Sequence, residues 1–413
     1  MPAPAPHAAA RAFIAVAGAA SWRARIAELA SAAGRGRRLG QALQQRHIVE
    51  LTLARLALTG TEPTPAAARM AALVGQVAGL AARLSPPGRA RLDAAIAGAL
   101  SGEGTLIPLL HLMHTAWRHR ARGFAVRFAG LEDGAPFDLL AERDGVAAEI
   151  VCDVVSAEQG RLVPRAAWLR LADGIDAELQ TWLAAHPGRY LLKMTLPEGL
   201  PEGLPGGLPG GLPGTLPEGG ADPAPLAALH ARIRAMLAGG PGVQQDAAIA
   251  LRLDPLLLAG AQSDQGGMMS MLRQEFGPEA HLAAVAATGG LFVLAARAGR
   301  EDDVAAAIRR RMMVLAPARL TGTRPGILAM MIEDTDRTEW RGLRERLTLE
   351  GEARQFLTYP EARTVAAVAC VSRLELFGMA PPDAAEGGEL RFRNPGHPAA
   401  RLAALAPAVA SVG

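Results

Sequence analysis

Two carboxylates, Glu149 and Asp153, stand on either side of Val151 in a stretch of apolar and β-branched residues. Alternate side chains of a β-strand point to the same face, so these two carboxylates are expected to share one face. Asp138 begins the preceding apolar stretch, and a hairpin would bring it near that face. Converging carboxylates are typical ligands of Mg²⁺ or Mn²⁺, and such a metal activates water for attack on a phosphodiester. The spacing therefore predicts metal ligation by Asp138, Glu149 and Asp153.

The elements that would position these side chains are a helix, three strands, a second helix and a fourth strand. Turn signals separate the strands, and Asp144-Gly145 is the strongest hairpin signal in the chain. The following helix has apolar residues at three- and four-residue spacings. In order, the expected elements are helix 105–121, strands 124–128, 137–141 and 146–156, helix 165–185 and strand 190–195.

This order, with Pro136-Phe137-Asp138 on the second strand and Glu149-Ile150-Val151 on the third, resembles the PD-(D/E)XK nuclease superfamily. The resemblance covers about residues 103–196. It implies a restriction-endonuclease-like α-β-β-β-α-β core, in which Asp138 and Glu149 take the two acidic positions and bind Mg²⁺ if the protein is catalytic.

The chain departs from the motif at Val151, which stands where the family has its lysine. That lysine helps to orient water and offsets phosphate charge, and valine does neither. Shifting the register by two places Val151 at the acidic position and Asp153 at the lysine position, which fits less well. Lys193 is the only lysine of the chain, so it is a candidate for the missing charge, as are Arg161 and Arg165. The alternative is that the three carboxylates face solvent or pair with arginines.

A net charge of +3 does not by itself indicate a nucleic-acid or membrane partner. If DNA or RNA is the partner, the expected phosphate contacts are arginines near the nuclease-like strands. Two cysteines in apolar stretches indicate free thiols and a cytoplasmic location. No apolar run is long enough to span a bilayer, so no membrane partner is expected. The expected phosphate contacts are Arg118, Arg120, Arg122, Arg161 and Arg165.

Outside these strands, the sequence predicts a disordered N-terminus (1–10), a helical region (11–100), an α/β region (101–400) and a flexible tail (401–413). Within the α/β region, residues 197–220 repeat Gly, Pro and Leu with a period of four, which is typical of an unpacked insertion. Strands that alternate with helices toward the C-terminus favour an α/β class. Whether residues 225–400 extend the same sheet or form a second domain stays open.

Two further groups of residues have a chemical and a structural interpretation. His111 and His114 have a metal-compatible spacing on a helix, but core or surface histidines are favoured. The run from Glu333 to Asp336 follows an apolar strand, where α/β folds bind ligands, but it is also typical of a helix cap. The cap is favoured.

Three functions remain compatible with these residues. The first is a catalytically degraded nuclease-like protein that binds nucleic acid or serves as a scaffold. The second is a divergent Mg²⁺-dependent nuclease that uses Asp138 and Glu149. The third is a protein-interaction module that uses the helical region and the 197–220 insertion and has no enzymatic activity.

Overall fold

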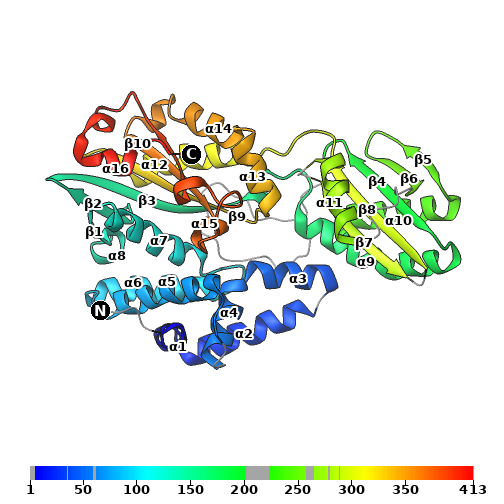
Figure 1. The fold of residues 1–413 in the computed structure, drawn as a ribbon, viewed down its shortest axis with the longest axis horizontal. Coiled ribbons are helices and arrows are strands. Elements are labelled where there is room, and N and C mark those ends of the chain that lie inside the picture. Colours follow the sequence, from blue (N-terminus) through cyan, green and yellow to red (C-terminus); the bar gives the residue numbers. More distant parts are fainter. Residues whose placement is uncertain are drawn as a thin grey trace.

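The computed structural model describes residues 5–34, 36–58, 62–200, 223–256, 265–277, 280–287 and 289–412. An N-terminal helical region lies against a six-stranded sheet (sheet A), and a five-stranded sheet (sheet B) lies beside both (Figure 1). The mixed α/β class expected from the sequence is confirmed. Across the described ranges, no helix has the length and apolar character needed to cross a membrane. Most of the 197–220 insertion lies outside the described residues.

Within the described residues, the helical region contains six helices, and two of them begin at side-chain caps. The side chain of Thr64 accepts a hydrogen bond from the N–H of Ala67, and Ser85 caps the next helix in the same way, each just before a proline. The expected disorder of residues 1–10 is wrong for the part that is described, because the first helix begins at Pro6 and buries Ala9 and Ala10. The helices are α1 (Pro6–Ala17), α2 (Ala19–Ala33), α3 (Arg37–Arg46), α4 (Ile48–Leu58), α5 (Pro65–Ala81) and α6 (Pro86–Ala99).

Sheet A has the strand order β1-β2-β3-β9-β10-β11. The first three strands form an antiparallel meander, β9 and β10 run parallel to β3, and β11 is antiparallel to β10. Asp144 and Gly145 both have positive φ, as the predicted two-residue hairpin requires. The strands are β1 (Ala125–Arg127), β2 (Leu139–Arg143), β3 (Val146–Ser156), β9 (Gly326–Glu333), β10 (Val365–Ser372) and β11 (Leu390–Arg393).

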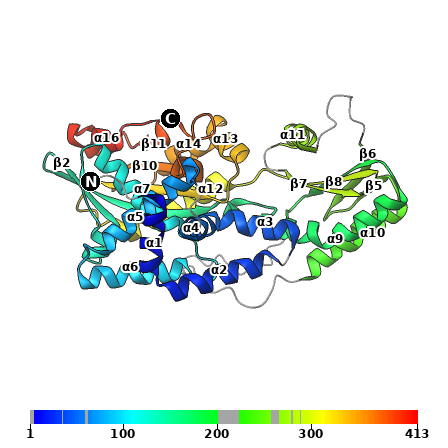
Figure 2. The same ribbon diagram turned by 60° about the horizontal axis from the view of Figure 1, so that its bottom comes forward.

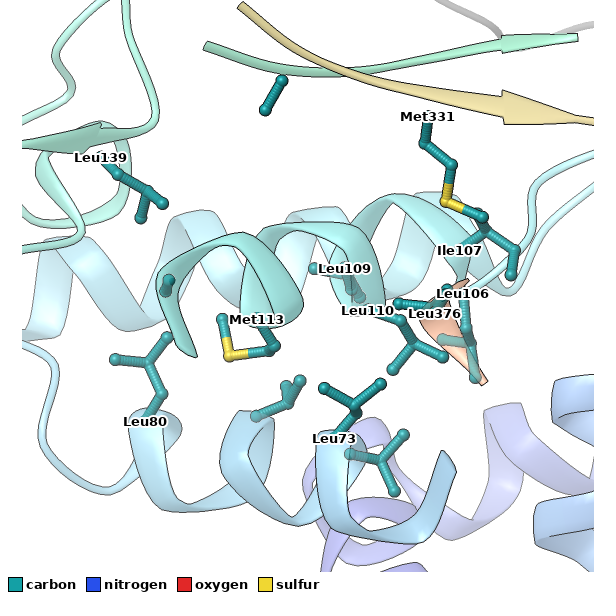
Figure 3. Close-up of a cluster of buried hydrophobic side chains, with 14 of the residues drawn as sticks. Leu73, Leu80, Leu106, Ile107, Leu109, Leu110, Met113, Leu139, Met331 and Leu376 are labelled. Carbon is teal, nitrogen blue, oxygen red and sulfur yellow. The ribbon is translucent and has the colours of Figure 1, made fainter. Parts of the chain in front are cut away.

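One face of sheet A is covered by α7 (Ile107–Ala121), which lies between the sheet and α5. Figure 3 shows the apolar side chains of α7 reaching both ways, toward Leu73 and Leu80 of α5 and toward Leu139 and Met331 of the sheet. This shared core fixes the helical region against the meander. The meander therefore has one face buried by α7.

The opposite face of sheet A packs against α12 (Val304–Arg319), α13 (Arg337–Glu345) and α14 (Thr348–Phe356). The last two of these helices are separated by a break at Leu347, which has a φ of 56°. This second face carries Val151, Leu328 and Met330 in its core. It is also the face on which the alternating carboxylates of β3 lie.

Sheet B has the order β5-β6-β4-β8-β7 and is formed by chain inserted between β3 and α12. Helices α9 and α10 bury one of its faces and α11 contacts the other (Figures 1 and 2). Residues 225–400 are thus divided between the two sheets. The elements are α9 (Arg165–Ala185), β4 (Arg189–Leu196), α10 (Pro223–Gly239), β5 (Gly242–Gln245), β6 (Ala250–Pro255), α11 (Gln265–Phe276), β7 (His281–Ala287) and β8 (Gly290–Ala298).

Two sequence predictions about connectivity and order require correction. The helix 165–185 and the strand 190–195 are present, but they belong to sheet B rather than to the sheet that holds Glu149. The C-terminal residues expected to form a flexible tail are packed on the protein, because Ala408 and Val409 are buried in the core shared by the helical region and sheet A, and Val412 pairs with Arg391 of β11.

Candidate functional site

The three predicted carboxylates lie along one face of the meander. Glu149, Val151 and Asp153 alternate on β3, and Leu140 of β2 pairs with Glu149. Asp138 immediately precedes β2, and its N–H donates to the carbonyl of Ile150 at 3.0 Å. The structure therefore brings the predicted side chains to the same face of sheet A, beneath α12.

Asp138 is held by an arginine of α12 and by the backbone of β3. Its Oδ1 accepts from Nη2 of Arg319 at 2.9 Å, and its Oδ2 accepts from the N–H of Cys152 at 2.7 Å. Burial raises the pKa of Asp138 above its usual value, although Arg319 and the Cys152 N–H oppose that rise. Arg319 also donates to the carbonyl of Pro136. Asp138 thus fixes the C-terminal end of α12 to the start of β2.

Asp153 is held by a second arginine from the same helix. Nε and Nη2 of Arg311 donate to its two carboxylate oxygens at 2.7 and 3.0 Å, which is a bidentate ion pair. Arg311 and Arg319 are eight residues apart, so they lie on the same side of α12. One row of this helix therefore neutralises two of the three carboxylates.

Glu149 is fully buried and is satisfied by the segment that follows α12. The N–H of Thr321 donates to Oε2 at 2.9 Å and its hydroxyl donates to Oε1 at 2.5 Å. Nη1 of Arg324 lies 3.6 Å from Oε1. The alternative in which the three carboxylates pair with arginines therefore accounts for Asp138, Glu149 and Asp153.

These contacts do not fit a magnesium site. Mg²⁺ requires carboxylate oxygens that converge on one point with room for its waters, whereas each carboxylate here is turned to its own donor. No group of three or more His, Cys, Asp or Glu side chains within the described ranges is arranged to hold a metal ion. The face has the residue types of a metal site but the contacts of a salt-bridged packing surface.

Lys193 does not complete this site, which corrects a sequence prediction. It lies on β4 of sheet B, where its Nζ is 3.5 Å from Glu275 and 5.0 Å from the ring centre of Phe276. The prediction failed because it assigned β4 to the sheet that carries Asp138.

Arg118 and Arg122, expected to contact phosphate, instead bind a buried carboxylate. Nε of Arg118 lies 3.1 Å and Nη2 of Arg122 lies 2.5 Å from Glu389, which precedes β11. Arg120 is exposed, donates to the carbonyl of Val126 and lies over the ring of Phe128. Of these three arginines, only Arg120 presents its guanidinium to solvent.

Arg161 and Arg165, the other two expected contacts, are tied to the start of α13. Nη2 of Arg161 lies 2.5 Å from Oε1 of Glu339, and Arg165 binds the other oxygen of that carboxylate at 2.9 Å. Arg161 is buried and also donates to Glu158 and to the Asp334 carbonyl. These arginines join the inserted chain to α13 and are engaged within the protein, so phosphate contact by them stays a prediction.

The run from Glu333 to Asp336 serves structure, as the favoured interpretation predicted. Asp336 caps α13 in a reciprocal capping box with Glu339. Asp334 binds Arg46 of α3 at 3.1 Å and accepts from Ser156 at 2.6 Å. The carboxyl end of β9 therefore ties the helical region to the sheet.

His111 and His114 are core residues rather than metal ligands. Both are buried, and Nε2 of His111 lies 2.9 Å from the carbonyl of Ala329. Burial lowers the pKa of both residues, strongly for His114, so each is neutral in the folded protein at pH 7. This confirms the structural interpretation of their spacing.

Sequence reasoning missed Arg311, Arg319 and Thr321, which complete the carboxylate face. The available signal was the pair of arginines on one side of an amphipathic helix that precedes an apolar strand. These arginines indicate partners of the carboxylates only when α12, rather than α9, is known to lie over β3.

Replacing Asp138 by alanine is expected to lower the free energy of unfolding by about 1–3 kcal/mol, because Arg319 and the Cys152 N–H lose a partly buried acceptor. Urea-induced unfolding at pH 7 measures this loss. Glu142→Ala, an exposed change on the same hairpin, is the matched control and should stay within about 0.5 kcal/mol of the wild type. Equal stability of the two variants would contradict the role assigned to Asp138.

Comparisons with protein families, with curated proteins and with solved structures find no match to this chain.

Proposed function

We propose that this chain is a nuclease-like protein that has lost catalysis and binds nucleic acid without cleaving it. The order helix, three-strand meander, helix and strand supports the nuclease-like part, when α7, β1–β3, α12 and β9 are taken as its members. Asp138 and Glu149 stand at the positions where the resemblance places the two acids. Chain inserted between β3 and α12 separates the two halves of this core.

The proposed loss of catalysis is supported by the ion pairs of Asp138 with Arg319 and of Asp153 with Arg311. In a metal-dependent nuclease, the positive charge beside the carboxylates comes from the metal and from a lysine. Here, guanidinium groups from α12 supply the charge, and the lysine position holds the buried Val151. An arginine that is bound to a carboxylate neutralises it but does not generate a nucleophile from water.

A cleavage assay tests this proposal on single- and double-stranded DNA and RNA with Mg²⁺ or Mn²⁺, followed by gel electrophoresis. The wild type is expected to leave every substrate intact while it retards the nucleic acid in a gel-shift experiment. Asp138→Ala, run beside it, controls for contaminating nuclease, whose activity would not depend on this residue. Metal-dependent cutting that disappears in Asp138→Ala would instead establish the divergent nuclease, and absence of any gel shift would remove the binding function.

A further inference from the structure

Basic charge is concentrated at the N-terminal end of the chain. Residues 1–46 contain seven arginines and one acidic residue, Glu28, whereas the remaining 36 of the 43 basic residues face 39 of the 40 acidic ones. The small net charge therefore conceals a strongly basic segment attached to a slightly acidic remainder. Uneven charge of this kind is a recognised footprint of a polyanion-binding surface.

The one acid of this segment is already neutralised, and some of its arginines are used inside the protein. Arg25 binds Glu28 at 2.8 Å and two backbone carbonyls near the end of α6. Arg38 binds Asp173 and Asp176 of α9, and Arg46 binds Asp334. Arg25 thus joins α2 to the chain after α6, and Arg38 and Arg46 hold the helical region to the rest of the protein.

Three other arginines have no such partner. Arg11 of α1, Arg23 of α2 and Arg37 at the start of α3 are exposed, and the described part of the chain offers them no ion pair or side-chain hydrogen bond. Figures 1 and 2 place α1 and α2 on the side of the helical region that faces away from sheet A. On that side, α1 and α2 therefore present the positive charges of Arg11 and Arg23 to solvent, and Arg37 adds an exposed charge at the start of α3.

The burial of the apolar side chains of these helices favours a nucleic acid over a membrane as the partner. Phe13 and Trp22 are buried, with ring centroids 6.0 Å apart, and none of the large exposed apolar residues belongs to α1, α2 or α3. A helix that binds a bilayer inserts such side chains, and a surface that binds single strands stacks bases on aromatic rings. Guanidinium groups on helices that themselves expose no large apolar or aromatic side chain fit the phosphates of a duplex, which carry a high linear charge density.

We infer that α1, α2 and the start of α3 form a sequence-independent binding surface for double-stranded nucleic acid, with Arg11, Arg23 and Arg37 as phosphate contacts. This inference rests on the proposed nucleic-acid binding and assigns it to the helical region. It replaces the five arginines near the meander and α9 that the sequence suggested, four of which are ion-paired within the protein.

The salt dependence of duplex binding tests the assignment, measured by fluorescence anisotropy on the full chain with a labelled DNA duplex of random sequence. In the triple variant Arg11→Ala, Arg23→Ala and Arg37→Ala, the slope of log K against log salt concentration should fall by about 2 to 3, since each phosphate contact contributes about 0.9. Replacing the same three residues by lysine should restore most of the slope. The matched control replaces Arg189, Arg297 and Arg401, which are exposed in sheet B and near the C-terminus, and should keep the wild-type slope.

The outcomes separate this inference from the function on which it depends. Duplex binding that survives the triple variant, or that is lost only in the control variant, overturns the inference and leaves the proposed function in place. Absence of wild-type binding to every nucleic acid overturns both. Wild-type binding to phosphatidylserine vesicles but not to the duplex, or stronger binding to a single strand than to the duplex, also overturns it. Circular dichroism of each variant checks that the helices are intact.

Discussion

Lowering the pH from 7 to 5 is expected to reduce the free energy of unfolding by about 4 kcal/mol through two buried histidines alone. His119 lies at the end of α7 beside Phe124, and His281 begins β7 beside Trp168. Burial lowers the pKa of each to about 4, from an ordinary value near 6.5. Hydrogen bonds to the carbonyls of Thr115 and Val163 only partly oppose this effect.

The sign of the effect follows from which state binds the proton. Well above pH 6.5 both states are neutral at these positions, so these histidines do not make stability change with pH. Between pH 6.5 and 4 the unfolded chain binds a proton that the folded protein excludes, and acid therefore favours unfolding. His111 and His114 act in the same direction, because burial lowers the pKa of each.

Urea-induced unfolding at pH 7 and at pH 5 measures this loss, and a double variant isolates the two histidines. His119→Leu removes a side chain whose Nε2 has no hydrogen-bond partner, and His281→Gln keeps a donor for the Val163 carbonyl. The difference in stability between the two pH values should shrink by about 4 kcal/mol in the double variant. The carboxylates are the same in both proteins, so their contributions cancel in the comparison.

His186→Gln supplies the control, since His186 is exposed and stacks on Trp182. Its pH dependence should match that of the wild type. A double variant that loses as much stability as the wild type between pH 7 and 5 would mean that His119 and His281 are protonated in the folded protein.

Periodicity and turn chemistry predicted most of the individual elements but not how they are connected. The hairpin at Asp144-Gly145, the strand over 146–156 and the helix over 165–185 were placed at the right residues. Local pattern shows that a helix buries one face, but it does not show against which sheet. Both α9 and α12 are amphipathic and both precede an apolar strand, so the nearer one was assigned to the core although α12 covers β3.

In the candidate site, too, local sequence pattern predicted which side chains share a face but not which side chains they contact. The sequence predicted that Asp138, Glu149 and Asp153 share a face, because alternation is a local property of a strand. Their partners Arg311, Arg319 and Thr321 lie more than 150 positions later in the chain, where local pattern gives no information about contact. The concentration of arginine in residues 1–46, by contrast, is a property of the sequence alone, but the net charge of the whole chain, +3, does not reveal it.

Replacing Glu389 by alanine is expected to lower the free energy of unfolding by about 3–5 kcal/mol, because it leaves a buried arginine without its counter-charge. Arg391 is 5% exposed, and its Nη1 lies 2.9 Å from Glu389, beside the contacts of Arg118 and Arg122 to the same carboxylate. Burial lowers the pKa of Arg391 to about 10 even with Glu389 present. Burial alone would raise the pKa of Glu389, but the three guanidinium groups hold it below its usual value.

Urea-induced unfolding at pH 7 gives the magnitude, and Glu389→Gln separates charge from volume. Glutamine fills the space and offers one acceptor but carries no charge. The free energy of unfolding of Glu389→Gln should therefore lie between those of the wild type and of the alanine variant. Glu386→Gln, which neutralises an exposed carboxylate three residues away, should leave stability unchanged.

The ion pairs of Glu389 also allow the roles of Arg118 and Arg122 to be tested. If they serve the fold, Arg118→Ala and Arg122→Ala will lower the free energy of unfolding and leave the salt dependence of duplex binding at its wild-type slope. If they are phosphate contacts, each will reduce that slope by about 0.9 with little loss of stability. The structure favours the first result, because a guanidinium engaged by a buried carboxylate would have to leave Glu389 unpaired in order to bind a phosphate.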